Sequence, residues 1–195
     1  PTDPIDPPAE EITPIHDIQG EGSTSTLEGS EVVTTGVVVG DFQGVAGSTT
    51  LHPEQLLGFF IQTTDADADA NPLTSQGLFV YCNNTCNETS VDVGDVVTVA
   101  GTVDERFGMT SIVNPVVSID AQVEVLPTST SIDLPVSSLD DYERYEGMLV
   151  TFTDTLSVAE YFQLSRFGEV VLYKGERPYQ YTHDNAPDAE GVEGM

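Results

Sequence analysis

The sequence has no tryptophan, only two cysteines and only five lysine or arginine residues among its 195 positions. Its 33 Asp and Glu residues give a formal net charge of −28. Holding a phosphate backbone by charge requires Lys and Arg side chains, so this composition disfavours electrostatic DNA binding by the acidic body of the chain. No apolar run approaches the ~20 residues that cross a bilayer as a helix, and we expect no membrane span.

The few basic residues are unevenly distributed. Residues 1–143 contain a single base, Arg106, whereas the other four bases and six of the seven tyrosines lie between Tyr142 and Tyr181. A highly acidic surface suits high salt, where the Debye length shrinks to roughly 3 Å at 1 M and self-repulsion is screened. We therefore expect a saline extracellular setting, and we expect any partner to meet the segment between Tyr142 and Tyr181.

The two cysteines, Cys82 and Cys86, are separated by three residues. A local disulfide between them would close a tight loop and would fit an oxidising compartment. A structural zinc site needs about four ligands, which two thiolates do not supply. We favour the disulfide over free thiols or a metal site.

The composition divides the chain into four segments. They are an acidic, proline-rich linker or tail (1–14), a β-rich domain (15–126), a second and incomplete β unit (127–183) and a disordered acidic tail (184–195). Within this second unit, Glu146-Gly-Met-Leu-Val-Thr151 is similar to Glu28-Gly-Ser-Glu-Val-Val-Thr34, which suggests the start of a second barrel. Only 49 residues follow Glu146, so a second five-stranded barrel would be incomplete, and we expect either that the chain is a fragment or that its last strands pack on the first domain.

Five segments of the first domain have the composition of β-strands, with turn-forming residues between them: 32–39, 58–63, 77–81, 95–103 and 108–113. Gly36 and Gly101 interrupt two of these strands, and an interior glycine usually marks a bulge or a sharp coil of the sheet, by which small barrels turn a corner. This layout predicts an all-β fold with an OB-fold-like, five-stranded Greek-key barrel, followed by a partial second β unit. The best short helix candidate is 53–57.

Two groups of segments resemble a known family. The run from Leu139 to Phe152, followed by 156–158 and 161–169, resembles the region ahead of the catalytic domain in ExeM/NucH-type secreted bacterial endonucleases. Segments 15–23, 36–42, 58–62 and 77–81 look like the amino-terminal OB-like domain of the same family. The resemblance covers roughly residues 12–181 and is most specific at Arg144-Tyr-Glu-Gly-Met148.

In that family, nuclease activity belongs to a downstream endonuclease/exonuclease/phosphatase domain that uses a divalent metal. No segment of this sequence matches that domain. The resemblance therefore implies a non-catalytic accessory OB-like domain of a secreted bacterial nuclease, which positions the enzyme on nucleic acid or supports its catalytic domain. The implied partners are weakly bound nucleic acid and the downstream nuclease domain.

An acidic turn between two predicted strands is a candidate calcium site. Carboxylate and amide oxygens at alternate positions can converge on Ca²⁺, which takes 6 to 8 oxygen ligands. Ala70 and Gln76 stand where an EF-hand loop would require Gly and Glu, so the loop is not an EF-hand. The alternative is a solvated acidic loop in an already acidic protein. The candidate ligands are Asp65, Asp67, Asp69 and Asn71.

The aromatic and basic residues near the carboxyl end have two interpretations. Aromatic side chains beside arginines can stack on single-stranded bases, at ~1–3 kcal/mol per base. The candidates for this stacking platform are Tyr145, Tyr161, Arg166, Phe167, Lys174 and Arg177. In the alternative, the segment forms a packed core with ion-paired arginines, and the core residues are Leu149, Phe152, Phe162, Leu164, Val171 and Tyr173.

The sequence offers no catalytic constellation. Its three histidines lie far apart and form no metal-binding or general-base pattern, and no nucleophile elbow or phosphate-binding glycine loop is present. An alternative function is a calcium-dependent extracellular structural, adhesion or assembly module that does not bind nucleic acid. A glycan-binding module is a third alternative, without a motif of its own.

Overall fold

The computed structural model describes residues 11–43, 56–82, 86, 89–167 and 169–177. The chain forms two compact units, the first made of residues 1–131 and 136–151 and the second of residues 132–135 and 152–195. The segment 136–151, which the composition grouped with the second β unit, thus lies with the first unit. Most of the helix candidate 53–57 lies outside the described residues.

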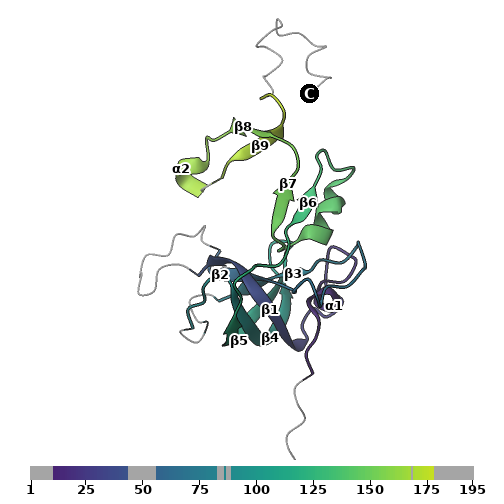
Figure 1. Ribbon diagram of the computed structural model, residues 1–195, viewed down its shortest axis with the longest axis vertical. Helices are drawn as coiled ribbons and strands as arrows, with labels where there is room; N and C mark the ends of the chain where they lie inside the picture. The colour runs from purple at the N-terminus through teal and green to yellow at the C-terminus, as the bar shows by residue number, and fades with distance from the viewer. Residues whose placement is uncertain (1–10, 44–55, 83–85, 87–88, 168, 178–195) are drawn as a thin grey trace, which may run out of the picture. The chain divides into compact units, whose positions relative to one another are not determined.

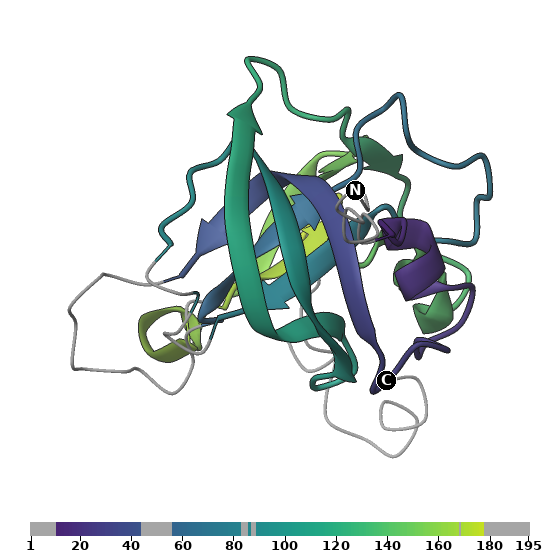
Figure 2. The same ribbon diagram turned by 90° about the horizontal axis from the view of Figure 1, so that it is seen from below.

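The first unit contains a closed five-stranded barrel (Figures 1 and 2). Its elements are α1 (Ile15–Gln19), β1 (Glu31–Phe42), β2 (Gly58–Gln62), β3 (Gly77–Tyr81), β4 (Asp95–Glu105) and β5 (Thr110–Gln122). The strands are hydrogen-bonded in the order β1-β2-β3-β5-β4, with β4 pairing back to β1, and only the β3–β5 pair is parallel. All five predicted strands are present, and the all-β barrel prediction is confirmed.

The barrel core follows from the alternation of side chains along the strands, which is most regular in β4. Phe59 and Ile61 of β2 and Leu78 and Val80 of β3 are completely buried, as are the valines of β4 that face them. Helix α1 packs against β1 and β3 and adds further buried isoleucine side chains to the core. None of the described helices is long and apolar enough to cross a membrane.

The two interior glycines behave differently from each other. At Gly101 the pairing of β4 with β5 shifts register between Ala100 and Thr102, as predicted. At Gly36 the pairing stays regular, and the bulge of β1 lies between Val38 and Gly40 instead. A Cβ on Gly36 would approach the side chains of the facing strand and helix to about 3 Å. Gly36 therefore allows close packing, and of the two expectations for it, a bulge or a sharp coil of the sheet, the bulge is absent.

The remaining elements form two small sheets, β6–β7 and β8–β9. They are β6 (Thr130–Ile132), the 3-10 helix η1 (Leu139–Tyr145), β7 (Val150–Phe152), β8 (Leu156–Glu160), α2 (Leu164–Phe167) and β9 (Val171–Lys174). Gly29 and Gly147, the glycines of the two repeated Glu-Gly pairs, both have positive φ, 79° and 69°. Like β1 and β2, strands β8 and β9 form an antiparallel pair with a bulge. The two turns thus share a backbone conformation, and the second partial barrel remains a prediction.

The described residues of the second unit bury few apolar side chains. The side chains of Phe162, Leu164, Val171 and Tyr173, which one interpretation placed in a core, are 45% to 80% exposed. That packing interpretation is wrong for these four residues. Only Leu149 and Phe152 of the six are partly buried.

Candidate binding surface on the barrel

One outer face of the barrel carries aromatic side chains. Because Phe59 and Val80 point into the core, the alternation along β2 and β3 turns Phe60, Phe79 and Tyr81 to the other side of the sheet, where Phe60 and Tyr81 are partly exposed and Phe79 is covered by its neighbours. The register places Phe60 opposite Phe79, so both rings lie on the same face. Pairing of the two strands thus builds a continuous aromatic row outside the barrel.

The row extends across three neighbouring strands. The ring centres of Phe42 and Phe60 are 5.9 Å apart in an edge-to-face arrangement, and those of Phe60 and Phe79 are 4.8 Å apart and tilted by 46°. Both geometries are attractive for aromatic pairs. Gly58 makes room for the third ring, because a Cβ there would lie 2.6 Å from Phe79 Cζ. Phe42, at the end of the row, is half exposed.

The turn between β4 and β5 presents Phe107 to solvent. Arg106 and Met109 exchange backbone hydrogen bonds of 2.9 and 3.0 Å, which makes Phe107 and Gly108 the central residues of a two-residue hairpin turn. Both have positive φ, 56° and 78°, as a type I′ turn requires. Asn or Gly is preferred at the first of these positions, and a bulky residue there is strained. The Phe107 side chain is nevertheless fully exposed, so no burial offsets the strain.

Arg106 joins this turn to the sheet. Its guanidinium carbon lies 3.6 Å from the centre of the Tyr81 ring and 5.7 Å from the centre of the Phe107 ring. The carboxylate of Asp104 lies 4.0 Å from the guanidinium. A guanidinium stacked on a ring is a planar surface of the kind on which bases stack. We define the aromatic–arginine surface as Phe42, Phe60, Tyr81, Arg106 and Phe107.

Residues 146–149 cover the opposite end of the same barrel face. The backbone N–H of Leu149 donates to Gln62 Oε1 at 2.8 Å. The backbones of Gly77 and Gly147 are in contact, since a Cβ on Gly77 would lie 2.2 Å from the carbonyl carbon of Gly147. The chain itself therefore occupies the end of β2 and β3 that is farthest from the aromatic–arginine surface.

The carboxyl group of Glu146 is held in this covered region. Its Oε1 accepts a hydrogen bond of 2.9 Å from the backbone N–H of Thr110, and it also interacts with the Gln19 side chain. Burial raises the pKa of Glu146 from its ordinary 4.5 to about 7, although these two hydrogen bonds act in the opposite direction. The negative charges of Glu143 and Glu105 raise this pKa further. The charge at the covered end thus changes near neutral pH.

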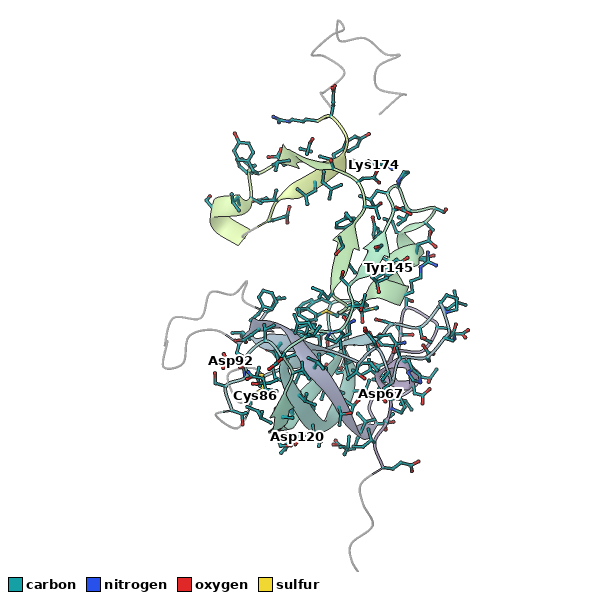
Figure 3. The ribbon with its side chains drawn as sticks, viewed as in Figure 1. Asp67, Cys86, Asp92, Asp120, Tyr145 and Lys174 are labelled. Carbon is teal, nitrogen blue, oxygen red and sulfur yellow. A yellow bond between two sulfur atoms is a disulfide. The ribbon has the colours of Figure 1, made fainter. Side chains whose placement is uncertain are left out.

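The predicted stacking platform is divided between the two compact units. Tyr145 belongs to the first unit, where it is partly buried at the end of η1 (Figure 3). The guanidinium carbon of Arg144 lies 5.1 Å from its ring centre. The same guanidinium lies 3.9 Å from the Asp141 carboxylate, an exposed pair of low energetic value.

The other members of the predicted platform belong to the second unit. Tyr161 is 63% exposed, and Arg177 is also exposed. The Lys174 ammonium lies 2.8 Å from the Asp154 carboxylate and donates to a backbone carbonyl. Their role in binding remains a prediction. The side chains that lie outside the described residues are those of Arg166 and Phe167.

Each predicted calcium ligand has its own hydrogen-bond partner in the protein. The pairs are Asp65 with Thr128, Asp67 with Thr64, Asp69 with Thr74 and Gln76, and Asn71 with Glu21. The hydrogen bonds from Thr128 lower the pKa of Asp65. Within the described part of the chain, no group of three or more His, Cys, Asp or Glu side chains is placed to hold a metal ion. The calcium site remains a prediction.

The predicted disulfide is confirmed. Cys82 and Cys86 are bonded, with their Cα atoms 4.7 Å apart, and both residues are buried at the end of β3 (Figure 3). The bond ties down the chain directly after Tyr81. A structural disulfide is compatible with an extracellular protein.

Sequence reasoning missed the aromatic–arginine surface, although two signals for it were present. Adjacent phenylalanines in one strand, Phe59 and Phe60, must face opposite sides, so one of them has to lie outside the barrel. A Phe-Gly pair between two β-runs stands where Asn-Gly or Asp-Gly is usual, which marks Phe107 as exceptional. The prediction relied instead on the concentration of tyrosines near the carboxyl end, and it did not use either of these two signals.

Comparison with known proteins does not assign a family to this chain. The resemblance to secreted nucleases therefore remains a prediction based on the segments quoted above. No protein-family model matches the sequence, and no curated protein matches it either.

Proposed function

We propose that this chain is a non-catalytic binding module of a secreted bacterial nuclease. In this proposal the barrel positions the enzyme on single-stranded nucleic acid through the aromatic–arginine surface. The observation that carries the proposal is the fully exposed Phe107, which occupies a strained backbone position beside an arginine stacked on Tyr81. Strained, exposed residues of this kind are more often kept for contact with a ligand than for stability.

The charge of the protein favours stacking over phosphate contacts as the source of affinity. Arg106 is the only Lys or Arg residue among the first 143 residues, and its guanidinium already forms an ion pair with the Asp104 carboxylate. Base stacking contributes about 1–3 kcal/mol per base and does not depend on the base sequence. A surface with one arginine and several rings therefore suits weak, sequence-tolerant binding of unpaired bases.

Fluorescence anisotropy with a labelled oligothymidylate tests this proposal. We expect saturable binding by the full chain whose affinity changes little between about 50 mM and 200 mM salt, because few phosphate charges are neutralised. The variant Phe107→Ala should bind about tenfold more weakly, as one lost stacking contact implies. Absence of binding by the unmodified chain would contradict the proposal.

Two further variants make the experiment specific. Val125→Ala removes another exposed apolar side chain of the first unit and should leave the affinity unchanged. Tyr161→Ala tests the competing prediction for the carboxyl-terminal residues. If Tyr161→Ala weakens binding and Phe107→Ala does not, nucleic acid is bound elsewhere than on the aromatic–arginine surface.

The non-catalytic part of the proposal has a separate test. Plasmid DNA incubated with the purified chain, Mg²⁺ and Ca²⁺ should remain supercoiled. Nicking or linearisation that persists in protein from an independent purification would show that the chain is itself a nuclease. In that case the assignment as an accessory module would be wrong.

A further inference from the structure

A cavity lies in the barrel wall where β1 and β2 separate. The two strands are paired only from Val37 and Gln62 onward, so the first half of β1 has no partner on this side. Residues 12–16 close the gap instead, with Thr13 N–H donating to the carbonyl of Val33 at 2.7 Å. The cavity between these segments has a volume of about 460 Å³, within the usual range for small-molecule sites.

Unsatisfied polar atoms concentrate at this cavity. Among the described residues, five buried side-chain nitrogen or oxygen atoms have no hydrogen-bond partner. Three of the five belong to residues that line the cavity: His16 Nδ1, Thr34 Oγ1 and Thr63 Oγ1. Buried polar groups are rarely left without partners, because their desolvation is not recovered. The three residues line one cavity, which makes its wall a candidate site for a hydrogen-bonding ligand.

Thr34 is the most informative of the three. It is completely buried on β1 and lies opposite Val99 on β4, which belongs to the apolar core. Valine has the same shape and the same strand preference, and it would avoid burying a hydroxyl group. A threonine at this position therefore fits a role for the hydroxyl itself.

The lining defines the chemistry of the ligand. Threonine hydroxyl groups both donate and accept hydrogen bonds, and Asp67, near α1 in Figure 3, adds an acceptor. Ile15 and Val96 provide apolar surface. The described lining contains no Lys or Arg, and the protein is strongly acidic, so an anion is disfavoured.

We propose that this cavity binds an uncharged sugar ring, a ligand that presents adjacent hydroxyl groups and an apolar C–H face. Side-chain rotation brings the hydroxyls of Thr34 and Thr63 and the imidazole of His16, which are buried in the free protein, within hydrogen-bonding distance of the sugar hydroxyls, and Ile15 and Val96 contact its carbon atoms. The site is separate from the aromatic–arginine surface, because it lies beyond the Gln62 end of β2 whereas Tyr81 pairs with Gly58 at the other end. The proposal does not depend on binding of nucleic acid.

NMR titration of the isotopically labelled full chain tests the proposal. The probes are glucose, galactose, mannose and N-acetylglucosamine, each as the free monosaccharide and as the end unit of an oligosaccharide. We expect at least one of these rings to cause saturable shifts of the amide signals of His16, Thr34 and Thr63. Equal effects of a free sugar and its oligosaccharide identify the single ring as the ligand, whereas tighter binding of the oligosaccharide identifies a glycan terminus. Glycerol at the same concentration is the control for nonspecific effects.

Isosteric variants separate binding from folding. Thr34→Val and Thr63→Val should weaken sugar binding about tenfold, because each removes a hydrogen bond to the ligand. The Tm of unliganded Thr34→Val should be unchanged or higher, because the variant no longer buries an unpaired hydroxyl. Thr98→Val is the matched control, since the Thr98 hydroxyl already donates to Asp120 at 2.6 Å and lies outside the cavity.

Two results would overturn the proposal. One is the absence of saturable shifts at the cavity with every sugar in the panel. The other is a lower Tm of unliganded Thr34→Val together with unchanged sugar binding. That combination would show that bound water satisfies the hydroxyl as part of the fold.

Discussion

The guanidinium of Arg106 lies against the ring of Tyr81, with its central carbon 3.6 Å from the ring centre. These two residues come from different elements, the turn after β4 and the end of β3. Their contact fixes the direction of the hairpin turn and therefore the position of Phe107. Through this contact the turn has a fixed position relative to the end of β3.

Replacing Phe107 by asparagine should separate stability from binding. Asparagine tolerates positive φ and is preferred at this turn position, so Phe107→Asn should stabilise the protein by about 1 kcal/mol. Removing the exposed ring should at the same time weaken binding of single-stranded DNA about tenfold. Urea unfolding and fluorescence anisotropy measure the two effects. A destabilised Phe107→Asn would mean that the ring stabilises the fold.

Because the Arg106 guanidinium stacks on Tyr81, we expect that a positive charge alone at this position does not maintain the affinity for single-stranded DNA. In Arg106→Lys the positive charge remains, but the planar group that lies against Tyr81 is lost. Affinity for single-stranded DNA should fall several-fold, since a contact of this type is worth about 0.5–2 kcal/mol. Arg177→Lys changes an exposed arginine of the second unit in the same way and is the control. A larger effect of Arg177→Lys would instead support the carboxyl-terminal stacking platform.

The strands were predictable because each is a local pattern. Runs such as Val32–Val39 are β-branched, and β4 is interrupted where the sequence places an interior glycine, Gly101. The disulfide between Cys82 and Cys86 was predictable for the same reason. Local geometry alone restricts two cysteines that are four positions apart.

The functional surfaces were not predictable in the same way. Thr34 and His16 line one cavity only because β1 separates from β2 and the amino-terminal residues fill the gap. The covering of Gln62 by Leu149 joins residues 87 positions apart. Such pairings depend on the closed barrel, and composition reports only how many tyrosines and arginines a segment has. For this reason, the composition placed the predicted binding residues in the segment after Tyr142.

The buried carboxyl group of Glu146 predicts a specific pH dependence of stability. Its pKa is about 7 in the folded protein, above the ordinary 4.5, so the folded state binds this proton more tightly than the unfolded state. The contribution of Glu146 is therefore fully present below about pH 4.5, decreases as the pH rises and is lost above about pH 7.

The variant Glu146→Gln keeps an acceptor for Thr110 and has no charge. Its stability relative to the unmodified protein should be similar at pH 4, should increase between about pH 4.5 and pH 7 and should level off at higher pH. Thermal unfolding of both proteins across this range measures the difference. Glu124→Gln, at an exposed position, is the control. A difference that does not change with pH would show that the carboxyl group is solvated in the folded protein.

The contact between Gly77 and Gly147 predicts that a single methyl group will detach the covering segment. In Gly77→Ala the new Cβ would lie 2.2 Å from the carbonyl carbon and 2.4 Å from the oxygen of Gly147, and backbone atoms cannot move aside as a flexible side chain can. We expect a loss of about 3 kcal/mol. Hydrogen exchange should accelerate at the Leu149 amide, which donates to Gln62, while the amides of the central barrel strands remain protected.

A second glycine distinguishes this steric effect from backbone strain. Gly20 has φ of 73°, and no atom lies within 4 Å of the position that a Cβ would take there, so Gly20→Ala should cost only about 1 kcal/mol. It should also leave exchange at Leu149 unchanged, because α1 does not hold that amide. If Gly77→Ala and Gly20→Ala behave alike, the two backbones are not in contact in solution. Residues 146–149 would then leave the Gln62 end of β2 uncovered, and the aromatic row could extend its binding surface along the whole strand.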